Sequence, residues 1–209
     1  MVVTGEGYDP HPRACHSLGE GLSVGPATVR LMAPADHYPA ARLVPYDPAW
    51  ERRYEQVAHD LMGALGPGWR IEHVGSTSVP GLVAKPVIDL ALAMPPGAHL
   101  ASFQEVFHRL GWSGPSQAGD HQALARHEDG VRESIAHVFP ADRWDEAHVR
   151  LFADWLRRDD TTRDRYGELK LELVRRGVWG PAYTEAKTAF VEEVVNRARA
   201  ARGWPPVSP

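Results

Sequence analysis

Residues 72–90 read EHVGSTSVPGLVAKPVIDL, and the rest of the chain is interpreted outward from them. Apolar runs typical of strands lie at both ends, at Trp69 to Val74 and at Pro86 to Met94. The second run is apolar enough for the middle of a sheet. A loop rich in glycine and hydroxyl residues joins the two runs. This stretch therefore predicts a strand, a loop and a second strand.

The loop has the composition of a phosphate-binding turn. Gly75 and Ser76 are followed by Thr77 and Ser78, whose backbone amides and hydroxyls can converge on a phosphate. An ordinary Gly/Ser turn has the same composition, so both interpretations stay open at this point. Lys85, at the end of the loop, adds a cation and favours the phosphate-binding interpretation.

Asp89 interrupts the second strand, which is otherwise apolar. A carboxylate is costly to bury unless another charge compensates it. A divalent metal ion or Lys85 would supply that charge, and Asp89 is therefore the candidate metal ligand. The alternative is a position at a strand edge or an ion pair with an arginine.

The remaining elements follow from apolar periodicity. Asp47 and Pro48 are typical of a helix start, and an apolar stripe with spacings of three and four follows them. A second helix is expected around Leu100 to Leu110, with strands at His121 to Arg126 and at Arg132 to Phe139. The C-terminal part is expected to be helical. These elements predict an α/β fold: a mixed β-sheet with helices packed mainly on one side, and C-terminal helices forming the far wall of a cleft.

The two ends of the chain lack such periodicity. Residues 1–40 are rich in glycine and proline and are interpreted as a flexible or loosely docked N-terminal arm. An apolar patch at Val29, Leu31 and Met32 can dock on the body or on a second subunit, so a homodimer stays open. Residues 201–209 are expected to form a C-terminal tail, which leaves residues 41–200 as one domain.

Composition excludes several classes of protein. The formal net charge is −4, with 23 basic and 27 acidic side chains, which disfavours general nucleic-acid binding. Cys15 is the single cysteine, so the chain can form neither an intrachain disulfide nor a cysteine metal cage. Its apolar runs are far shorter than the roughly 20 residues that a membrane helix needs. A soluble, cytoplasmic protein is expected.

The run from Glu72 to Leu90 closely resembles the signature of the GrpB family, also called UPF0157. The resemblance covers roughly residues 41–200. It extends to further motifs along the chain: Tyr46-Asp47-Pro48-x-Trp50, Ala136-His137-Val138, Phe152 to Arg157, Tyr166-x-x-Leu169-Lys170, and Tyr183-x-x-Ala186-Lys187-x-x-Phe190. This family is similar to nucleotidyltransferases, and some dephospho-CoA kinases carry such a domain at their C-terminus.

The resemblance implies a role for the loop and for Asp89. Nucleotidyltransferases hold the triphosphate with a Gly-Ser turn and hold Mg²⁺ with acidic residues on the next strand. Gly75-Ser76 and Asp89 match those positions. The second acid expected on the strand is replaced by Ala91, as in the GrpB family itself, so a second metal would need Glu133, Asp120 or a histidine. Two further departures from the family pattern are Ser134, in place of a histidine, and Ala153, in place of an arginine.

Further candidate residues surround this core. His73 is expected to hold the loop by hydrogen bonds, and His137 is either a ligand, a general base or a structural histidine. Arg126 and Arg132 can clamp phosphate or form surface salt bridges. The resemblance also points to three residues on C-terminal helices that can close over a nucleotide: Lys170, Tyr183 and Lys187. For the two lysines, the alternative is a solvated face of an amphipathic helix.

The leading functional hypothesis is a metal-dependent nucleotidyl or phosphoryl transferase that uses ATP or another nucleotide with Mg²⁺. Its acceptor would be a small molecule, with Asp89, His137 and Lys85 as the catalytic residues. One alternative is a non-catalytic module that binds a nucleotide or a CoA precursor, which the alanine at position 91 favours. Another is a different, pathway-specific reaction with His137 and Asp89 as acid and base.

Overall fold

The computed structural model describes residues 43–207. Within them, one mixed five-stranded sheet has the order β1-β2-β5-β4-β3. The strands are β1 (Arg70–Val74), β2 (Ile88–Ala93), β3 (Trp112–Ala118), β4 (His121–Glu128) and β5 (Val131–Phe139). The central pair, β2 and β5, is parallel, and the other neighbours are antiparallel. This arrangement places the run that carries Asp89 between two partners, as its apolar character predicted.

Four of the strands lie where the apolar runs predicted them, and β3 was missed. Gly114 and Pro115 interrupt β3 and hide its periodicity. Proline lacks an N–H donor and is tolerated mainly in edge strands. Since β3 pairs only with β4, it lies at the edge of the sheet and accommodates Pro115 there.

Two helices cover one face of the sheet. Helix α1 (Ala49–Leu65) begins where Asp47 predicted it, because the Asp47 Oδ1 accepts a hydrogen bond from the Ala49 amide at 2.8 Å. A 3₁₀ turn (Leu100–Phe103) leads into α2 (Gln104–Arg109). Both helices pack with Ile88, Leu90 and Leu92 of β2 in one apolar core.

The C-terminal part is helical, as predicted. It contains α3 (His148–Arg158), α4 (Asp160–Arg175), α5 (Gly180–Glu185) and α6 (Thr188–Ala200). The side chain of Asp159 caps α4 by accepting a hydrogen bond from the Thr162 amide at 2.8 Å. Helices α3, α4 and α6 share an apolar core with Val79 and Leu82 of the loop after β1.

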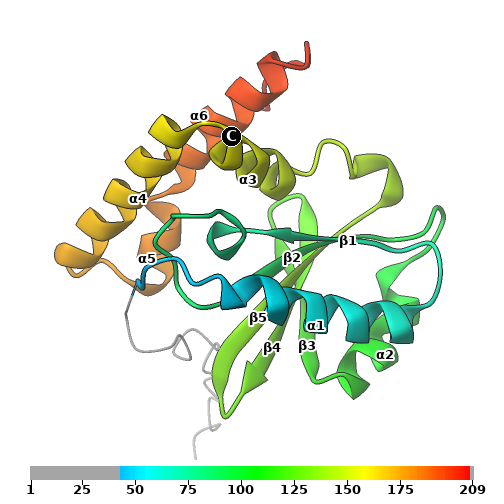
Figure 1. Cartoon of the computed structure of the whole chain (residues 1–209). Coiled ribbons are helices and arrows are strands. Elements are labelled where there is room, and N and C mark those ends of the chain that lie inside the picture. The colour runs from blue at the N-terminus through cyan, green and yellow to red at the C-terminus, as the bar shows by residue number, and fades with distance from the viewer. Residues whose placement is uncertain (1–42, 208–209) are drawn as a thin grey trace, which may run out of the picture. The chain divides into compact units, whose positions relative to one another are not determined.

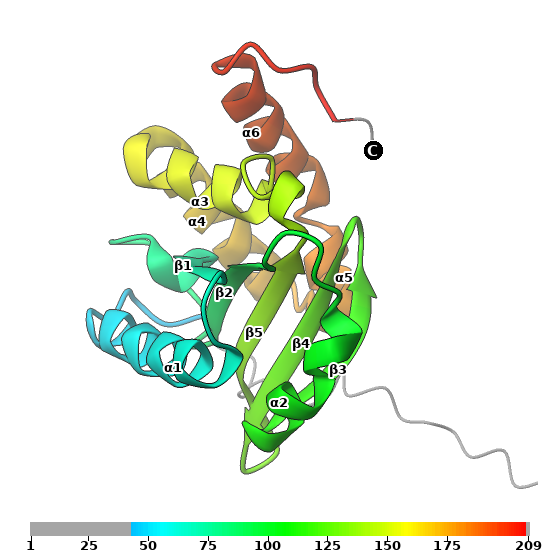
Figure 2. The same ribbon diagram turned by 90° about the vertical axis from the view of Figure 1, so that its right-hand side faces the viewer.

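Helices lie on both faces of the sheet, which corrects the expectation that they pack mainly on one side. Alternate residues of β2 enter different cores: Leu90 and Leu92 face α1, whereas Ala91 and Ala93 pack with Ala153 of α3. Figures 1 and 2 show α1 and α2 on one side of the strands and α3, α4 and α6 on the other. Asp89 lies two residues before Ala91 and therefore on the same face of β2, so it faces the C-terminal helices.

Residues 201–207 pack back on the helices. Trp204 joins the core of α3, α4 and α6, and the Arg199 Nε donates a hydrogen bond to the Pro205 carbonyl at 2.6 Å. The predicted N-terminal arm, residues 1–40, lies outside the described residues. In the described part of the chain, no helix combines the length and apolar character needed to cross a membrane.

Candidate functional site

The bend at Gly75 lies directly against the carboxylate of Asp89. Val74, the last residue of β1, pairs with Asp89 across the ladder, and Gly75 then turns with φ of 68°. A Cβ atom at position 75 would lie 2.2 Å from the Asp89 Oδ2. Only a residue without a side chain permits this approach. The bend and the strand carboxylate therefore share one site.

Two cavities adjoin at Asp89, with volumes of about 210 Å³ and about 300 Å³. Both are lined by Ser76, Asp89, His137 and Lys187. The larger cavity also reaches Lys85, Lys170 and Tyr183. The Asp89 side chain keeps 24% of its surface exposed, so it faces this space rather than the apolar core.

Side chains of β1 and the loop hold the bend. The His73 Nε2 lies 3.1 Å from the Thr77 Oγ1, which donates a hydrogen bond to the Val87 carbonyl at 3.1 Å. The His73 Nδ1 lies 3.2 Å from Glu51 of α1. The Ser78 hydroxyl donates to the Gly75 carbonyl at 2.8 Å. His73, Thr77 and Ser78 thus fix the shape of the loop, and Thr77 and Ser78 are buried beneath it.

Helices α3 and α4 also hold the loop. Arg157 of α3 donates from Nε to the Ser78 carbonyl at 3.0 Å and from Nη2 to the His73 carbonyl at 2.6 Å. Lys170 of α4 donates from Nζ to the Ser76 Oγ at 3.0 Å and to the Val83 carbonyl. Lys170 is therefore a support beneath the loop. Sequence reasoning missed the role of Arg157, although this residue lies in a family motif.

Cations gather around Asp89 on one side. Burial, together with the charges of Lys187 and Arg132, lowers the pKa of Lys85 to about 8. Burial also lowers the pKa of Lys187 to about 8, although Asp89 partly offsets this shift. The Tyr183 ring lies 4.3 Å from the Lys85 Nζ and 4.4 Å from the Lys187 Nζ. An anion in this recess would be stabilised by both ammonium groups.

His137 lies opposite the bend, next to Asp89. Its Nε2 is 3.8 Å from the Asp89 Oδ1, and its Nδ1 is 2.8 Å from the Nε2 of His121. The His121 Nδ1 in turn lies 3.2 Å from the carboxylate of Asp120. Sequence reasoning did not single out His121, because nothing in the spacing shows that β4 and β5 bring it beside His137.

These contacts determine the tautomer of the histidine pair. Burial, with a smaller contribution from His137, lowers the pKa of His121 to about 4, so its ring is neutral near pH 7. A carboxylate only accepts, so the His121 Nδ1 carries the proton and its Nε2 accepts from the His137 Nδ1. A neutral His137 then directs the lone pair of its Nε2 toward Asp89. That nitrogen can accept a proton or bind a cation.

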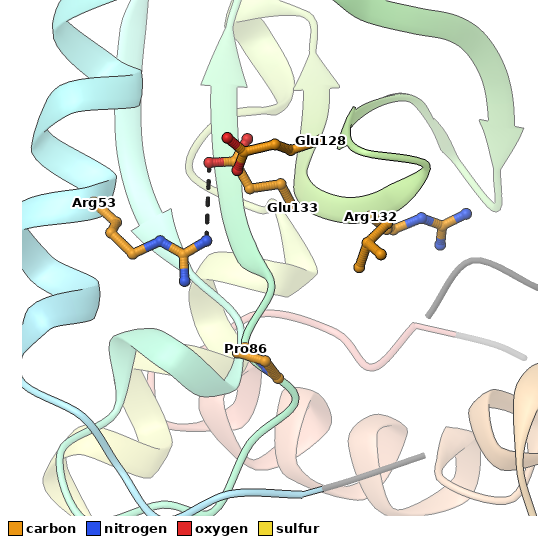
Figure 3. A pocket seen from close by; sticks show the side chains of 6 residues that line it. Arg53, Pro86, Glu128, Arg132 and Glu133 are labelled. Carbon is orange, nitrogen blue, oxygen red and sulfur yellow. Dashed lines mark ion pairs between the residues drawn. The ribbon is translucent and has the colours of Figure 1, made fainter. Parts of the chain in front are cut away.

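Arg126 is placed differently from the expected phosphate clamp, whereas Arg132 lies near enough to Lys85 for its charge to lower the pKa of that lysine. Arg126 has the parity of Leu124, which packs in the core on the α1 side, and its Nε donates to Glu133 at 2.9 Å. Arg132 and Glu133 line a separate cavity of about 180 Å³. Figure 3 shows Arg53 extending from α1 toward Glu133, at 3.8 Å, while Arg132 points away from this pair. Glu133 is therefore no second ligand beside Asp89.

Ala91, which stands where nucleotidyltransferases carry a second acid, is buried, as are Ala153 and Ser134, which depart from the GrpB pattern. Ala91 is fully buried and lies opposite His137 in the parallel ladder. Ala153 is also fully buried and packs against the same face of the sheet. Ser134 is buried, and its Oγ has no hydrogen-bond partner among the described residues. Within residues 43–207, Asp89 is thus the one carboxylate that lines the two adjoining cavities.

A family description, "GrpB protein", matches residues 40–197. The chain belongs to the GrpB family. A UPF0157 protein from Halalkalibacterium halodurans is 31% identical over 78% of this chain and 85% of that protein. A dephospho-CoA kinase from Mycolicibacterium paratuberculosis is 27% identical over 79% of this chain and 48% of that protein. The predicted family and its relation to dephospho-CoA kinases are confirmed.

A solved structure supports the same fold. The crystal structure of conserved protein GrpB from Enterococcus faecalis has a TM-score of 0.69 at 27% identity, and the likeness covers 78% of this chain and 99% of that chain. Because the GrpB match extends from residue 40 to residue 197, it includes all of the strands and helices α1 to α5, and most of α6.

Proposed function

We propose that this GrpB-family chain is a nucleotidyl or phosphoryl transferase that acts on a small-molecule acceptor and uses a nucleotide with one Mg²⁺. The observation that carries the proposal is the contact between the Gly75 bend and the Asp89 carboxylate, with Lys85 and Lys187 beside them. A hydroxyl-bearing bend and two ammonium groups suit a polyphosphate, and the adjoining carboxylate suits its cation.

The donor set fits one Mg²⁺ and not two. Mg²⁺ prefers oxygen ligands and is commonly held by one or two carboxylates together with substrate phosphates and water. Asp89 supplies one carboxylate, and Ala91 supplies none. Asp89 would therefore hold a single Mg²⁺, which would neutralise charge on the transferred phosphoryl group.

The chain's own residues would divide the remaining work. The Gly75 and Ser76 segment, kept rigid by Lys170 and Arg157, orients the phosphates. Lys85 and Lys187 neutralise their charge. The His137 Nε2 accepts the proton of the acceptor hydroxyl, and the contact with His121 orients the His137 ring. General-base catalysis of this kind contributes about 10²- to 10⁴-fold in rate.

The proposal is tested by isothermal titration of the full chain with a panel of nucleoside triphosphates, each with and without Mg²⁺. We expect at least one nucleotide to bind, with Mg²⁺-dependent affinity. Asp89→Asn should remove the Mg²⁺ dependence and weaken binding at least about tenfold, since it removes the only carboxylate that the described part of the chain contributes to these cavities. Absence of binding across the panel would contradict the proposal.

Glu133→Gln is the matched control. The Glu133 side chain is 19% exposed and that of Asp89 is 24% exposed, so both are partly buried carboxylates of the same sheet. Glu133 lies on the opposite face and lines the other cavity. Its substitution should leave nucleotide affinity unchanged, and an equal loss in both variants would point to a general loss of structure.

A second candidate function is a binding module without transfer activity. The buried Ala91 favours it, because a second metal-binding carboxylate is missing from β2. The two candidates differ in turnover. If the chain binds a nucleotide but releases neither pyrophosphate nor inorganic phosphate with any acceptor tried, and Asp89→Asn affects binding alone, the module is the better description.

A further inference from the structure

A second group of metal-binding side chains lies beyond His137. Asp120, in the turn between β3 and β4, meets His121 at the start of β4 and His148 at the start of α3. The donor atoms of these three residues all lie within 4.8 Å of one another. The Asp120 Oδ1 is 3.2 Å from the His121 Nδ1 and 3.6 Å from the His148 Nδ1. Two imidazoles and one carboxylate form the ligand set of many open zinc sites.

This group lies beside a cavity that is larger than the two cavities next to Asp89. The cavity has a volume of about 650 Å³, and both Asp120 and His148 line it. His148, Lys187 and Val191 border this cavity as well as the smaller one beside Asp89, so the two spaces adjoin. A cation held by three side chains would keep a coordination position open for water or a ligand.

The surroundings of the group are those of a supported metal site. His121 is buried, and its second nitrogen is held by His137 at 2.8 Å, the kind of outer hydrogen bond that orients a metal-binding imidazole. Arg143 contacts the other oxygen of Asp120, Oδ2, at 3.6 Å and leaves Oδ1 for the ion.

We propose that Asp120, His121 and His148 bind a divalent transition-metal cation such as Zn²⁺, separately from the Mg²⁺ proposed for Asp89. Imidazole nitrogen favours transition metals of this kind, whereas Mg²⁺ favours oxygen. Binding requires both rings to change tautomer: the proton of His121 moves to its Nε2, which donates to the His137 Nδ1, and the proton of His137 moves to its Nε2. The base role proposed for the His137 Nε2 therefore applies to the protein without this second ion.

Cobalt provides the test, because a tetrahedral Co²⁺ centre absorbs visible light far more strongly than a hydrated octahedral one. All proteins are full-length and carry Cys15→Ser, since a thiolate is itself a strong ligand for such ions. We expect one equivalent of Co²⁺ to give tetrahedral absorption and Zn²⁺ to displace it. His148→Ala and Asp120→Asn should each weaken Co²⁺ binding at least about tenfold.

Two control variants locate the ion. His108→Ala removes an exposed histidine of α2, and Asp89→Asn removes the carboxylate of the proposed Mg²⁺ site; both should retain the tetrahedral spectrum. Circular dichroism establishes that each variant is folded. The proposal is overturned if the parent shows no tetrahedral absorption, if His148→Ala leaves it unchanged, or if Asp89→Asn weakens binding as much as His148→Ala does.

Discussion

At position 75 the backbone leaves no room for a methyl group. Gly75→Ala would place Cβ 2.2 Å from the Asp89 Oδ2, at a φ of 68° that side chains rarely adopt. We expect a loss of about 3 kcal/mol or more in the free energy of unfolding, measured by urea denaturation, because conformational strain and a steric clash add. Nucleotide binding should be lost as well.

Gly81→Ala is the matched substitution for this prediction. Gly81 also has positive φ, at 79°, but the nearest atoms to an added Cβ are 3.8 Å away on Arg163. Gly81→Ala should lower the free energy of unfolding by about 1 kcal/mol, through backbone strain alone. Equal costs at both positions would mean that Asp89 does not constrain the bend.

The lowered pKa values of Lys85 and Lys187 predict how anion binding depends on pH. Both groups have pKa values of about 8, so they are largely protonated at pH 7 and lose their charge as the pH rises through 8. Besides burial, the charges of Lys187, Arg132 and Asp89 act on Lys85, and the charge of Asp89 acts on Lys187. Nucleotide affinity should therefore be highest below pH 8 and fall between pH 8 and 9.5, as titration calorimetry would measure.

The same shifts affect stability in the opposite direction. The folded-state pKa values of Lys85 and Lys187, about 8, lie below the ordinary value of 10.5. Between pH 8 and pH 10.5, the unfolded chain therefore binds more protons than the folded chain does. The contribution of these lysines to stability without ligand should thus rise between about pH 8 and pH 10.5. Lys187→Met should flatten both pH profiles, and unchanged profiles would exclude Lys187 from the recess.

Among the elements, α3 determines how firmly the loop is held. Arg157→Met removes the hydrogen bonds to the Ser78 and His73 carbonyls, at a cost of about 2 kcal/mol, because hydrogen bonds from a charged donor contribute about 1.5–3 kcal/mol. Hydrogen exchange should then accelerate at residues 73–79 in particular. The Arg158 side chain is 73% exposed. Arg158→Met should therefore change neither the free energy of unfolding nor hydrogen exchange at residues 73–79 measurably.

The elements also differ in how far they could be predicted. Strong periodicity or a long apolar run identified α1, β1, β2, β4 and β5, whereas Gly114 and Pro115 concealed β3. The loop and Asp89 were recognised because an acid in a buried strand is chemically conspicuous. The roles of Arg157 and His121 depend on contacts between distant segments, and one sequence contains no signal for such contacts. Arg126 was assigned to the site because alternation along a strand sorts its residues into two faces but does not show which face Asp89 shares.

For the molecule as a whole, the packed segment after α6 contributes to stability. Truncation after Gly203 removes Trp204 from the core of α3, α4 and α6, together with the carbonyl that Arg199 contacts. We expect the Tm to fall by about 2–6 °C, corresponding to about 1–2 kcal/mol of lost burial. Val207→Ser, at an exposed side chain, should leave the Tm nearly unchanged, and an unchanged Tm after truncation would show that this segment adds nothing.

The hydrogen bond from Arg157 to His73 spans 84 residues, and that from Lys170 to Ser76 spans 94. During synthesis, the glycine bend and its aspartate leave the ribosome long before the helices that secure them. A nascent chain that ends before α4 would contain the strands yet lack Lys170 and Lys187. The ability to bind a nucleotide would consequently appear late in translation. Nucleotide binding would then report that α4 and the helices after it have been synthesised and have packed against the loop.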